Sequence, residues 1–404
     1  MRFSQIHCAV EWNATRRNED VFRQIMDREG ENKADAYGRT ALHKASGAGD
    51  LDIVNLLLDR GAMVDGVDNE DNIALIRAAA EGHIDVVKLL LDRGAIIDSA
   101  NEQGRTALME ATFHRQLQIV KLLLERGASL EIRNKRGHTA LIMASCGWRA
   151  DIVKELLDKS FSINPAYKCD DTALCGAAAY GHIETVKLLL DNGASIDSVS
   201  SRGDTPLILS ARYGHVDVIK LLLDRGAVID SVDSKGNTAL MEAAAARGHV
   251  DVIKLLLDRG ANIESVNERG RTALMVAAEK GKDRVVKILL SRGAIIDKAD
   301  IDGTTALMVA VKNTYYEAHT VKILLINGAD ISIRNNDGKI AYDLINDSEN
   351  NGYKKYLKYA LGRRFCCVRF HHIGEIKRCD GMKEGIIVCC GAAMGDRNGV
   401  FLRI

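Results

Sequence analysis

The sequence predicts an all-α solenoid in which short helix-turn-helix units with hairpin loops stack side by side. Three observations favour this fold class: a period of 33 residues runs through the chain, each period holds two short helical patterns, and a glycine follows the second pattern. Only 2 of the 404 residues are proline, which excludes long Pro-rich linkers. Helices this short are marginal alone in water, so we expect each unit to be stabilised by its neighbours.

Two independent columns of residues set the phase of the repeat. The first column opens the first helical pattern and comprises Thr40, Ile73, Thr106, Thr139, Thr172, Thr205, Thr238, Thr272, Thr305 and Ile340. The second column follows the Leu-rich pattern and comprises Gly61, Gly94, Gly127, Gly193, Gly226, Gly260, Gly293 and Gly328. Because both columns share one period, the repeat is a property of the structure and not of local composition.

Each element of one period has a physical reason. Thr106 is expected to cap the first helix with its hydroxyl. The second helix is predicted over residues 84–93, where apolar residues recur at helical spacing while Asp85 and Lys88 face outward. Gly94 is expected to end this helix in the left-handed conformation. The residues that follow, 97–105, have the Asx and Gly content of a tight hairpin.

The two ends of the chain depart from the repeat. We expect residues 1–34 to form a capping helical unit and residues 35–362 to form an array of about ten units. The last of these units is a cap, with a first helix from Ile340 and a second over residues 353–361. Residues 363–404 form a Cys-rich tail whose structure the sequence does not predict.

The motifs of the period resemble those of the ankyrin repeat family. They are Gly-x-Thr-Ala-Leu, then Ala-Ala-x-Gly-His at residues 79–83 and 178–182, then Val-x-Lys-Leu-Leu-Leu-Asp-x-Gly-Ala. The family's usual Thr-Pro-Leu-His motif is only partly present. Its Pro is found only at Pro206 and its His only at His43. We expect Met or Ile packing to replace that His elsewhere. The resemblance implies a non-enzymatic protein-interaction scaffold or adaptor.

Composition and motifs favour no enzyme class. The 55 basic residues balance 55 acidic ones, so the net charge is zero. The protein as a whole therefore has no electrostatic attraction for nucleic acid or membranes. No long apolar run or signal peptide is visible, and we predict a cytoplasmic, monomeric protein. Catalytic, phosphate-binding and dinucleotide motifs are absent, so no catalytic residue, cofactor or metal ligand is assigned. The Gly-His pairs at His83, His182, His215 and His249 fall one per repeat, too far apart to share a metal, and are interpreted as turn residues.

The tail carries five of the 9 cysteines, Cys366, Cys367, Cys379, Cys389 and Cys390, near His371 and His372. Neither Cys pair has the spacing of a zinc site, yet zinc binding and cysteine acylation stay open beside a loosely docked tail. An effector or enzyme-associated protein with its activity in this tail is therefore an alternative function. A nuclear or nucleic-acid-associated regulator is a second alternative.

Binding residues are expected where the repeats differ. Positions seven to nine after the Thr column bring an aromatic to four successive repeats, although the chain is only 5% aromatic. Such side chains beside Arg are typical of interface hot spots, while filling of local gaps is the competing interpretation. The residues before the hairpin tips are basic in the middle of the array and acidic towards its C-terminal end, which suits an acidic protein or peptide partner. The predicted partner-binding residues are Phe113, His114, Arg136, Trp148, Lys168, Tyr180, Arg202, Arg212 and Tyr213.

The unit spanning residues 139–167 is the least regular. Trp148 stands where other units have Gly, Ser160 replaces the glycine that ends the second helix, and Pro165 enters the hairpin. We expect a change of curvature or a soft hinge there.

Overall fold

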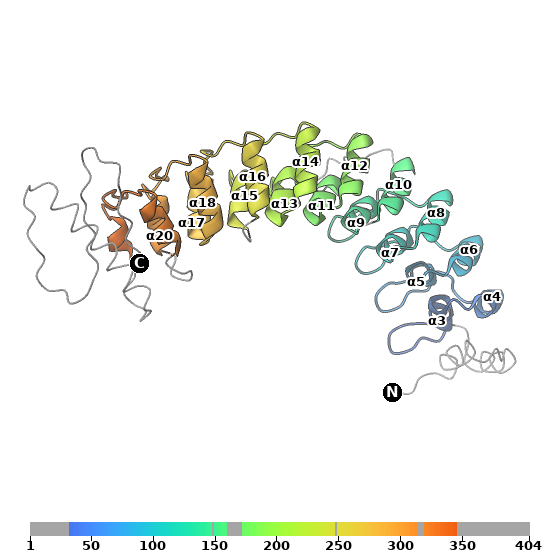
Figure 1. Cartoon of the computed structure of the whole chain (residues 1–404). Coiled ribbons are helices and arrows are strands. Elements are labelled where there is room, and N and C mark those ends of the chain that lie inside the picture. The colour runs from blue at the N-terminus through green and yellow to red at the C-terminus, as the bar shows by residue number, and fades with distance from the viewer. Residues whose placement is uncertain (1–31, 148, 160–171, 247–248, 313–318, 346–404) are drawn as a thin grey trace, which may run out of the picture. The chain divides into compact units, whose positions relative to one another are not determined.

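The computed structural model describes residues 32–147, 149–159, 172–246, 249–312 and 319–345 (Figure 1). They belong to two compact units, residues 1–268 and residues 269–404. Within the described residues the elements are helices, and the hairpins contain isolated bridges, such as Ala100 with Thr106, in place of strands. The predicted all-α repeat solenoid is confirmed.

The described part of the first unit consists of helix pairs that pack side by side. The first helices of the pairs are α3 (Ala41–Ala48), α5 (Ala74–Glu81), α7 (Ala107–Phe113), α9 (Ala140–Cys146), α11 (Ala173–Tyr180), α13 (Pro206–Tyr213) and α15 (Ala239–Ala245). The second helices are α4 (Leu51–Asp59), α6 (Ile84–Asp92), α8 (Leu117–Glu125), α10 (Ala150–Lys159), α12 (Ile183–Asp191), α14 (Val216–Asp224) and α16 (Val250–Asp258). Each first helix packs against the first helix of the next pair, and the second helices do the same.

The second unit continues the pattern with two pairs and a final turn. Its helices are α17 (Ala273–Glu279), α18 (Asp283–Ser291), α19 (Ala306–Lys312), α20 (His319–Ile326) and the 3₁₀ helix η1 (Ala341–Leu344). The predicted first helix of the last unit is thus a single 3₁₀ turn. Its predicted second helix, residues 353–361, lies outside the described residues, as do residues 1–31 of the N-terminal cap and the tail.

The first helices begin where the Thr column predicts. Thr106 has extended backbone, and its Oγ1 accepts a hydrogen bond from the Met109 backbone N–H at 3.4 Å. The same contact recurs at Thr172, whose Oγ1 lies 3.1 Å from the Cys175 backbone nitrogen. This bond satisfies one of the four amides left unpaired at a helix start. The predicted N-caps are confirmed at these positions.

The core forms between the two helix layers of successive pairs. In α6, Val86, Val87 and Leu90 are buried while Asp85 and Lys88 are exposed, as the periodicity predicts. The position of the motif His is filled by buried Ile76, Met109, Ile142, Ile208 and Met241. The predicted Met and Ile packing is confirmed at these positions, whereas the buried residue at the same position of α11 is Cys175.

A left-handed residue closes most first helices, and one of them is not glycine. Gly82 ends α5 at φ 93°, whereas Arg115, one repeat later, has φ 66°. A non-glycine residue in this region brings its Cβ close to the following carbonyl oxygen, at about 1–2 kcal/mol. Arg115 is exposed.

Replacing Arg115 by Gly is predicted to stabilise the protein by about 0.5 to 1 kcal/mol. Glycine removes the strain of the left-handed backbone from the folded state. This gain is larger than the loss that comes from the greater chain entropy of glycine in the unfolded state. Chemical denaturation of the full chain measures the change. Gly82→Ala is the matched control and should destabilise, because its new Cβ would lie 2.6 Å from Gln116 Nε2 at φ 93°. A lower free energy of unfolding for Arg115→Gly would contradict the assignment of strain.

Candidate partner-binding surface

The hairpin tips of the first unit are joined to one another through the backbone. The Lys135 N–H donates to the Gln103 carbonyl oxygen at 2.9 Å, and the Ser234 N–H donates to that of Arg202 at 2.9 Å. The Glu268 N–H continues the series to Lys235 at 3.1 Å. At these hairpins the backbone of each tip is therefore held against the tip of the next repeat.

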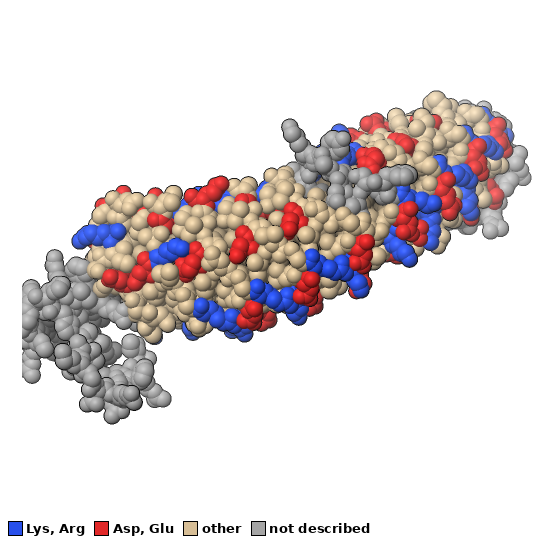
Figure 2. Space-filling model, turned by 90° about the horizontal axis from the view of Figure 1, so that it is seen from above, with Lys and Arg blue, Asp and Glu red and all other residues tan. Residues whose placement is uncertain are grey.

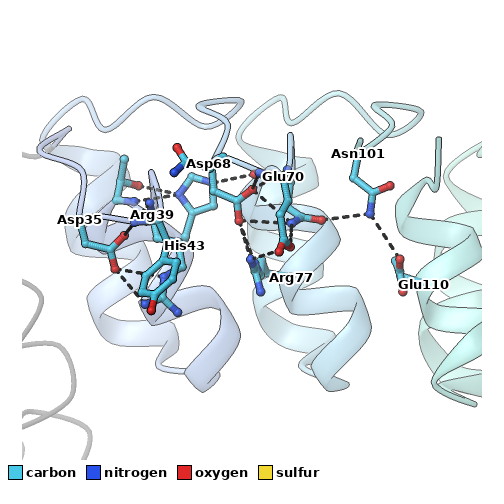
Figure 3. A network of polar contacts seen from close by, with 12 residues as sticks. Asp35, Arg39, His43, Asp68, Glu70, Arg77, Asn101 and Glu110 are labelled. Carbon is cyan, nitrogen blue, oxygen red and sulfur yellow. Dashed lines mark hydrogen bonds and ion pairs between the residues drawn. The ribbon is translucent and has the colours of Figure 1, made fainter. Parts of the chain in front are cut away.

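A polar network below the tips connects three repeats at the N-terminal end of the first unit (Figure 3). His43 Nδ1 lies 3.1 Å from the Thr40 backbone nitrogen, and His43 Nε2 lies 2.8 Å from the Asn72 carbonyl oxygen in the next repeat. Asn101 continues the chain of contacts, since its Nδ2 donates to Asn72 Oδ1 at 3.1 Å and to Glu110 Oε1 at 3.4 Å. His43 thus joins its own hairpin to the hairpin of the next repeat.

Charge is balanced inside this network. Asp68 is buried, and Arg77 Nη2 lies 2.5 Å from its Oδ2 (Figure 3). Burial alone would raise the pKa of Asp68, but hydrogen bonds from Arg77 and from the backbone of Asn72 and Glu70 lower it overall. Asp68 therefore stays ionised at neutral pH and holds Arg77 against the hairpin.

Two buried imidazoles are held in the neutral form. Burial lowers the pKa of His43 and also that of His182, whose Nε2 lies 3.0 Å from the Cys146 carbonyl oxygen one repeat back. A neutral imidazole can donate through Nε2 to these carbonyls without bringing a charge into the core.

The free energy of unfolding is predicted to decrease as pH falls below about 6.5. The folded-state pKa values of His43 and His182 are lowered, so below the ordinary histidine value the unfolded chain binds more protons than the folded chain. The two histidines make their full contribution to the free energy of unfolding above the ordinary histidine pKa, and this contribution is lost as pH falls below it. Denaturation at pH 7.5, 6.5 and 5.5 measures the slope.

His43→Gln is predicted to be less stable than the parent at pH 7.5 and to lose less on acidification. His114→Gln is the control, because this side chain is exposed. An identical pH slope for the parent and His43→Gln would contradict the assignment.

Three of the predicted aromatic residues lie on the surface at the ends of first helices. Phe113, Tyr180 and Tyr213 are the last residues of α7, α11 and α13 and are 56%, 57% and 55% exposed. The Arg105 guanidinium lies over the Phe113 ring at 4.8 Å, and the His114 ring meets it edge-on at 5.2 Å. Trp148 lies outside the described residues. Rings with this exposure are not core fillers.

The predicted cations divide into exposed and paired ones. Arg136 and Arg202 are exposed at hairpin tips, and Lys168 lies outside the described residues. Arg212 is different, since its Nη2 lies 2.7 Å from Asp204 Oδ1 and its Nε lies 2.7 Å from Glu242 Oε2. Arg212 is half-buried and thus joins its own hairpin to the next repeat.

The electrostatics of Arg212 agree with this internal role. Burial alone would lower its pKa, but hydrogen bonds to Asp204 and Glu242 raise the pKa well above the ordinary arginine value. The guanidinium is therefore always charged and its planar donors are used bidentately by Asp204, with Nη1 at 3.0 Å and Nη2 at 2.7 Å from the two oxygens. Comparing equivalent positions of the repeats did not predict this pairing, because Glu242 belongs to the following repeat.

Arg212→Ala is predicted to destabilise the protein by about 3 kcal/mol, because it leaves Asp204 with an uncompensated buried charge. Arg202→Ala is the matched control at an exposed tip and should change the free energy of unfolding by less than about 0.5 kcal/mol. Urea denaturation of both variants makes the comparison. Equal effects would show that Arg212 is not an internal ion-pair partner.

The Gly-His positions join repeats in a way that the sequence did not indicate. His83 Nε2 lies 3.0 Å from the Gly47 carbonyl oxygen, and His215 Nε2 lies 2.9 Å from that of Ala179. Each contact spans 36 residues, which is slightly more than one period. Within the described part of the chain, no group of three His, Cys, Asp or Glu side chains is arranged to hold a metal ion.

The second helices carry a row of ion pairs between neighbouring repeats. Each pair joins the Arg at the end of one second helix to the Asp one repeat earlier: Arg93–Asp59 at 2.7 Å, and Arg126–Asp92, Arg225–Asp191 and Arg259–Asp224 at 2.8 Å. Basic and acidic side chains lie next to one another along the surface in Figure 2. Exposed ion pairs contribute at most about 1 kcal/mol each to the free energy of unfolding. The main effect of this row is therefore to neutralise charge on the surface of the second helices.

Several predictions concern residues outside the described ranges. The Cys-rich tail, the irregular segment 160–171 and its Pro165 belong to this group. In the described residues no helix is long and apolar enough to cross a membrane.

Comparison with known proteins supports the repeat assignment. The family model for ankyrin repeats in three copies matches residues 6–101, 65–134, 108–200, 174–267 and 244–335. A search of curated proteins finds no match.

Proposed function

The chain belongs to the ankyrin repeat family, and from this premise we propose that it is a non-enzymatic scaffold or adaptor that binds a protein or peptide partner. Ankyrin repeats are generally protein–protein interaction modules. The proposed contact surface comprises the ends of the first helices and the hairpin tips of the first unit.

One observation carries the proposal: Phe113, Tyr180 and Tyr213 are more than half exposed at equivalent ends of first helices. The chain is only 5% aromatic, so three exposed rings at the ends of first helices are more than core packing requires. Large, rigid rings beside arginine give much contact area at low entropic cost, and they dominate binding energy at interfaces.

The tips and the helix ends supply two parallel rows for such a partner. Helix α13, whose eight residues run from Pro206 to Tyr213 and are about 12 Å long, lies between the two rows. Arg136 and Arg202 lie in the tip row, and His114 lies in the row of helix ends. An extended segment or an edge of a folded partner fits across this distance.

The same surface supports binding more than catalysis. Its ionised groups either face solvent or pair with one another, as Arg212 does with Asp204 and Glu242. A cytoplasmic, monomeric protein is part of the proposal, since partner binding as an adaptor needs neither a membrane segment nor a second copy of the chain.

The triple variant Phe113→Ala, Tyr180→Ala and Tyr213→Ala is predicted to weaken partner binding by more than about 2 kcal/mol, or about 30-fold. The partner is first identified by affinity capture with the full chain and mass spectrometry. Its affinity for purified parent and variant is then measured by titration calorimetry.

The control variant removes equally exposed apolar side chains from the loops after the second helices: Met63→Ala, Ile96→Ala and Val228→Ala. These are 60%, 57% and 55% exposed. Helical content should be unchanged in both variants. A partner whose affinity falls equally for the two triples, or for neither, would refute the proposed surface.

A further inference from the structure

The hairpin of residues 133–138 differs in charge from the other hairpins. It contains Arg133, Lys135 and Arg136 and no carboxylate, whereas the six residues before each other member of the Thr column include at least one Asp or Glu. Lys135 and Arg136 are exposed at the tip, and neither forms an ion pair within the described residues. Positive charge is therefore concentrated at the tip of a single hairpin.

The turn itself does not require the missing carboxylate. In a later repeat, Asp233 Oδ1 accepts hydrogen bonds from two backbone N–H groups of its hairpin, both at 2.8 Å. Asn134 Oδ1 accepts the equivalent two bonds at 2.9 and 3.0 Å. Asn134 thus folds its hairpin as Asp233 does, but it brings no negative charge to the tip.

The helix that follows the hairpin also lacks a carboxylate. In the preceding repeat, Asn101 Nδ2 donates to Glu110 Oε1 at 3.4 Å, and the same carboxylate lies 3.4 Å from Arg105. The equivalent contact joins Asn134 Nδ2 to the Met143 Sδ atom at 3.8 Å. Helix α9 contains no charged residue. The tip cations therefore meet no carboxylate on the helix that their own hairpin leads into.

Contacts within and between hairpins hold this tip in place. The Lys135 N–H donates to the Gln103 carbonyl oxygen at 2.9 Å, and Arg133 Nη1 donates to the Gly137 carbonyl oxygen at 2.9 Å. Glu102 is exposed in the preceding hairpin, one stacking step of about 8–10 Å away. The tip is therefore fixed to the array, and on this side its positive charge ends within one repeat.

We infer that the partner proposed above carries a phosphorylated serine or threonine, which binds to Lys135 and Arg136. This inference rests on the proposed function and specifies its ligand. A phosphoryl group carries a charge of about −1.5 to −2 at neutral pH and three strong acceptor oxygens on a single residue. Two adjacent exposed cations match that charge, and the planar guanidinium of Arg136 can donate to two of the oxygens at once. The residues that form the site lie in the continuous described stretch 32–147.

Other anionic ligands fit this tip less well. A run of carboxylates, or a nucleic-acid strand with a phosphate about every 3.4 Å, extends beyond one hairpin. It then meets exposed Glu102 in the preceding hairpin and exposed Glu131 just before this one. An anionic membrane is recognised by clusters of about four to eight cations, whereas two are exposed at this tip. A single carboxylate brings only one charge to these two cations.

Peptide pools test the inference on the full-length protein. Each pool consists of labelled nine-residue peptides with one fixed central residue and random uncharged residues elsewhere. The central residue is phosphoserine in the first pool, serine in the second and glutamate in the third. A fourth probe is a peptide with four adjacent glutamates, and a fifth is a single-stranded oligonucleotide. Fluorescence anisotropy measures the affinity of each probe.

The phosphoserine pool is expected to bind at least about tenfold more tightly than the serine pool and at least about threefold more tightly than each other probe. The double variant Lys135→Glu and Arg136→Glu should bind this pool at least about tenfold more weakly. The matched control, Arg202→Glu and Lys235→Glu, makes the same charge change at the tips of hairpins that contain a carboxylate. Its affinity should stay within about twofold of the parent.

A second variant tests the uncharged helix. Met143→Glu places a carboxylate where the preceding repeat has Glu110, and this charge should weaken binding of the phosphoserine pool by at least about threefold. Met143→Gln has the same size without the charge, and its affinity should stay within about twofold of the parent. Circular dichroism confirms that all of these variants are folded.

Three outcomes would overturn the inference: binding of the serine or glutamate pool as tight as that of the phosphoserine pool, tighter binding of the acidic peptide or the oligonucleotide, or equal losses in a variant and its matched control. The proposed function has a separate test in the variant of Phe113, Tyr180 and Tyr213. If the captured partner depends on those rings but is insensitive both to phosphatase treatment and to the double variant of Lys135 and Arg136, the proposed function stands and the phosphorylated ligand is wrong.

Discussion

Contact between neighbouring repeats is the constraint on which the rest of the structure depends. A first helix of seven or eight residues and a second helix of eight to ten are too short to be stable alone. Their apolar faces are buried against the next pair, and three kinds of polar contact repeat with them: backbone bonds between hairpin tips, imidazole to carbonyl bonds at the Gly-His turns, and Arg–Asp pairs on the second helices. The fold is thus specified locally and repeated along the chain.

This constraint also determines where a ligand can be bound. Residues that join repeats must be similar in each of them, so the tips and helix ends are the positions where side chains can vary without loss of stacking. Arg202 and Arg212 illustrate the division, because they are ten residues apart in one repeat and have opposite roles. Arg212 holds one carboxylate of its own repeat and one of the next repeat, while Arg202 contributes only its backbone to the stack and leaves its side chain exposed.

The sequence was sufficient for the helices because their signals lie within one repeat. The Thr caps, the buried Val86, Val87 and Leu90, and the helix-ending glycines could all be predicted from local spacing. The polar partners could not, since Glu242 is 30 residues from Arg212 and the imidazoles of His83, His182 and His215 reach carbonyls 36 residues earlier. Such contacts run diagonally between repeats, and comparing equivalent positions does not reveal them.

The Arg–Asp row on the second helices has a consequence for the evolution of the array. In these pairs each Arg takes its carboxylate from the preceding repeat, and Asp224 beside Arg225 is in turn offered to the Arg of the next repeat. Asn192 stands at the Arg position of one repeat. Removal of one whole repeat therefore brings Arg259 to Asp191 in place of Asp224, and the two charges are still matched. The same applies when a repeat that carries both this Asp and this Arg is duplicated, so gene-level expansion or contraction by such repeats keeps the pairs matched.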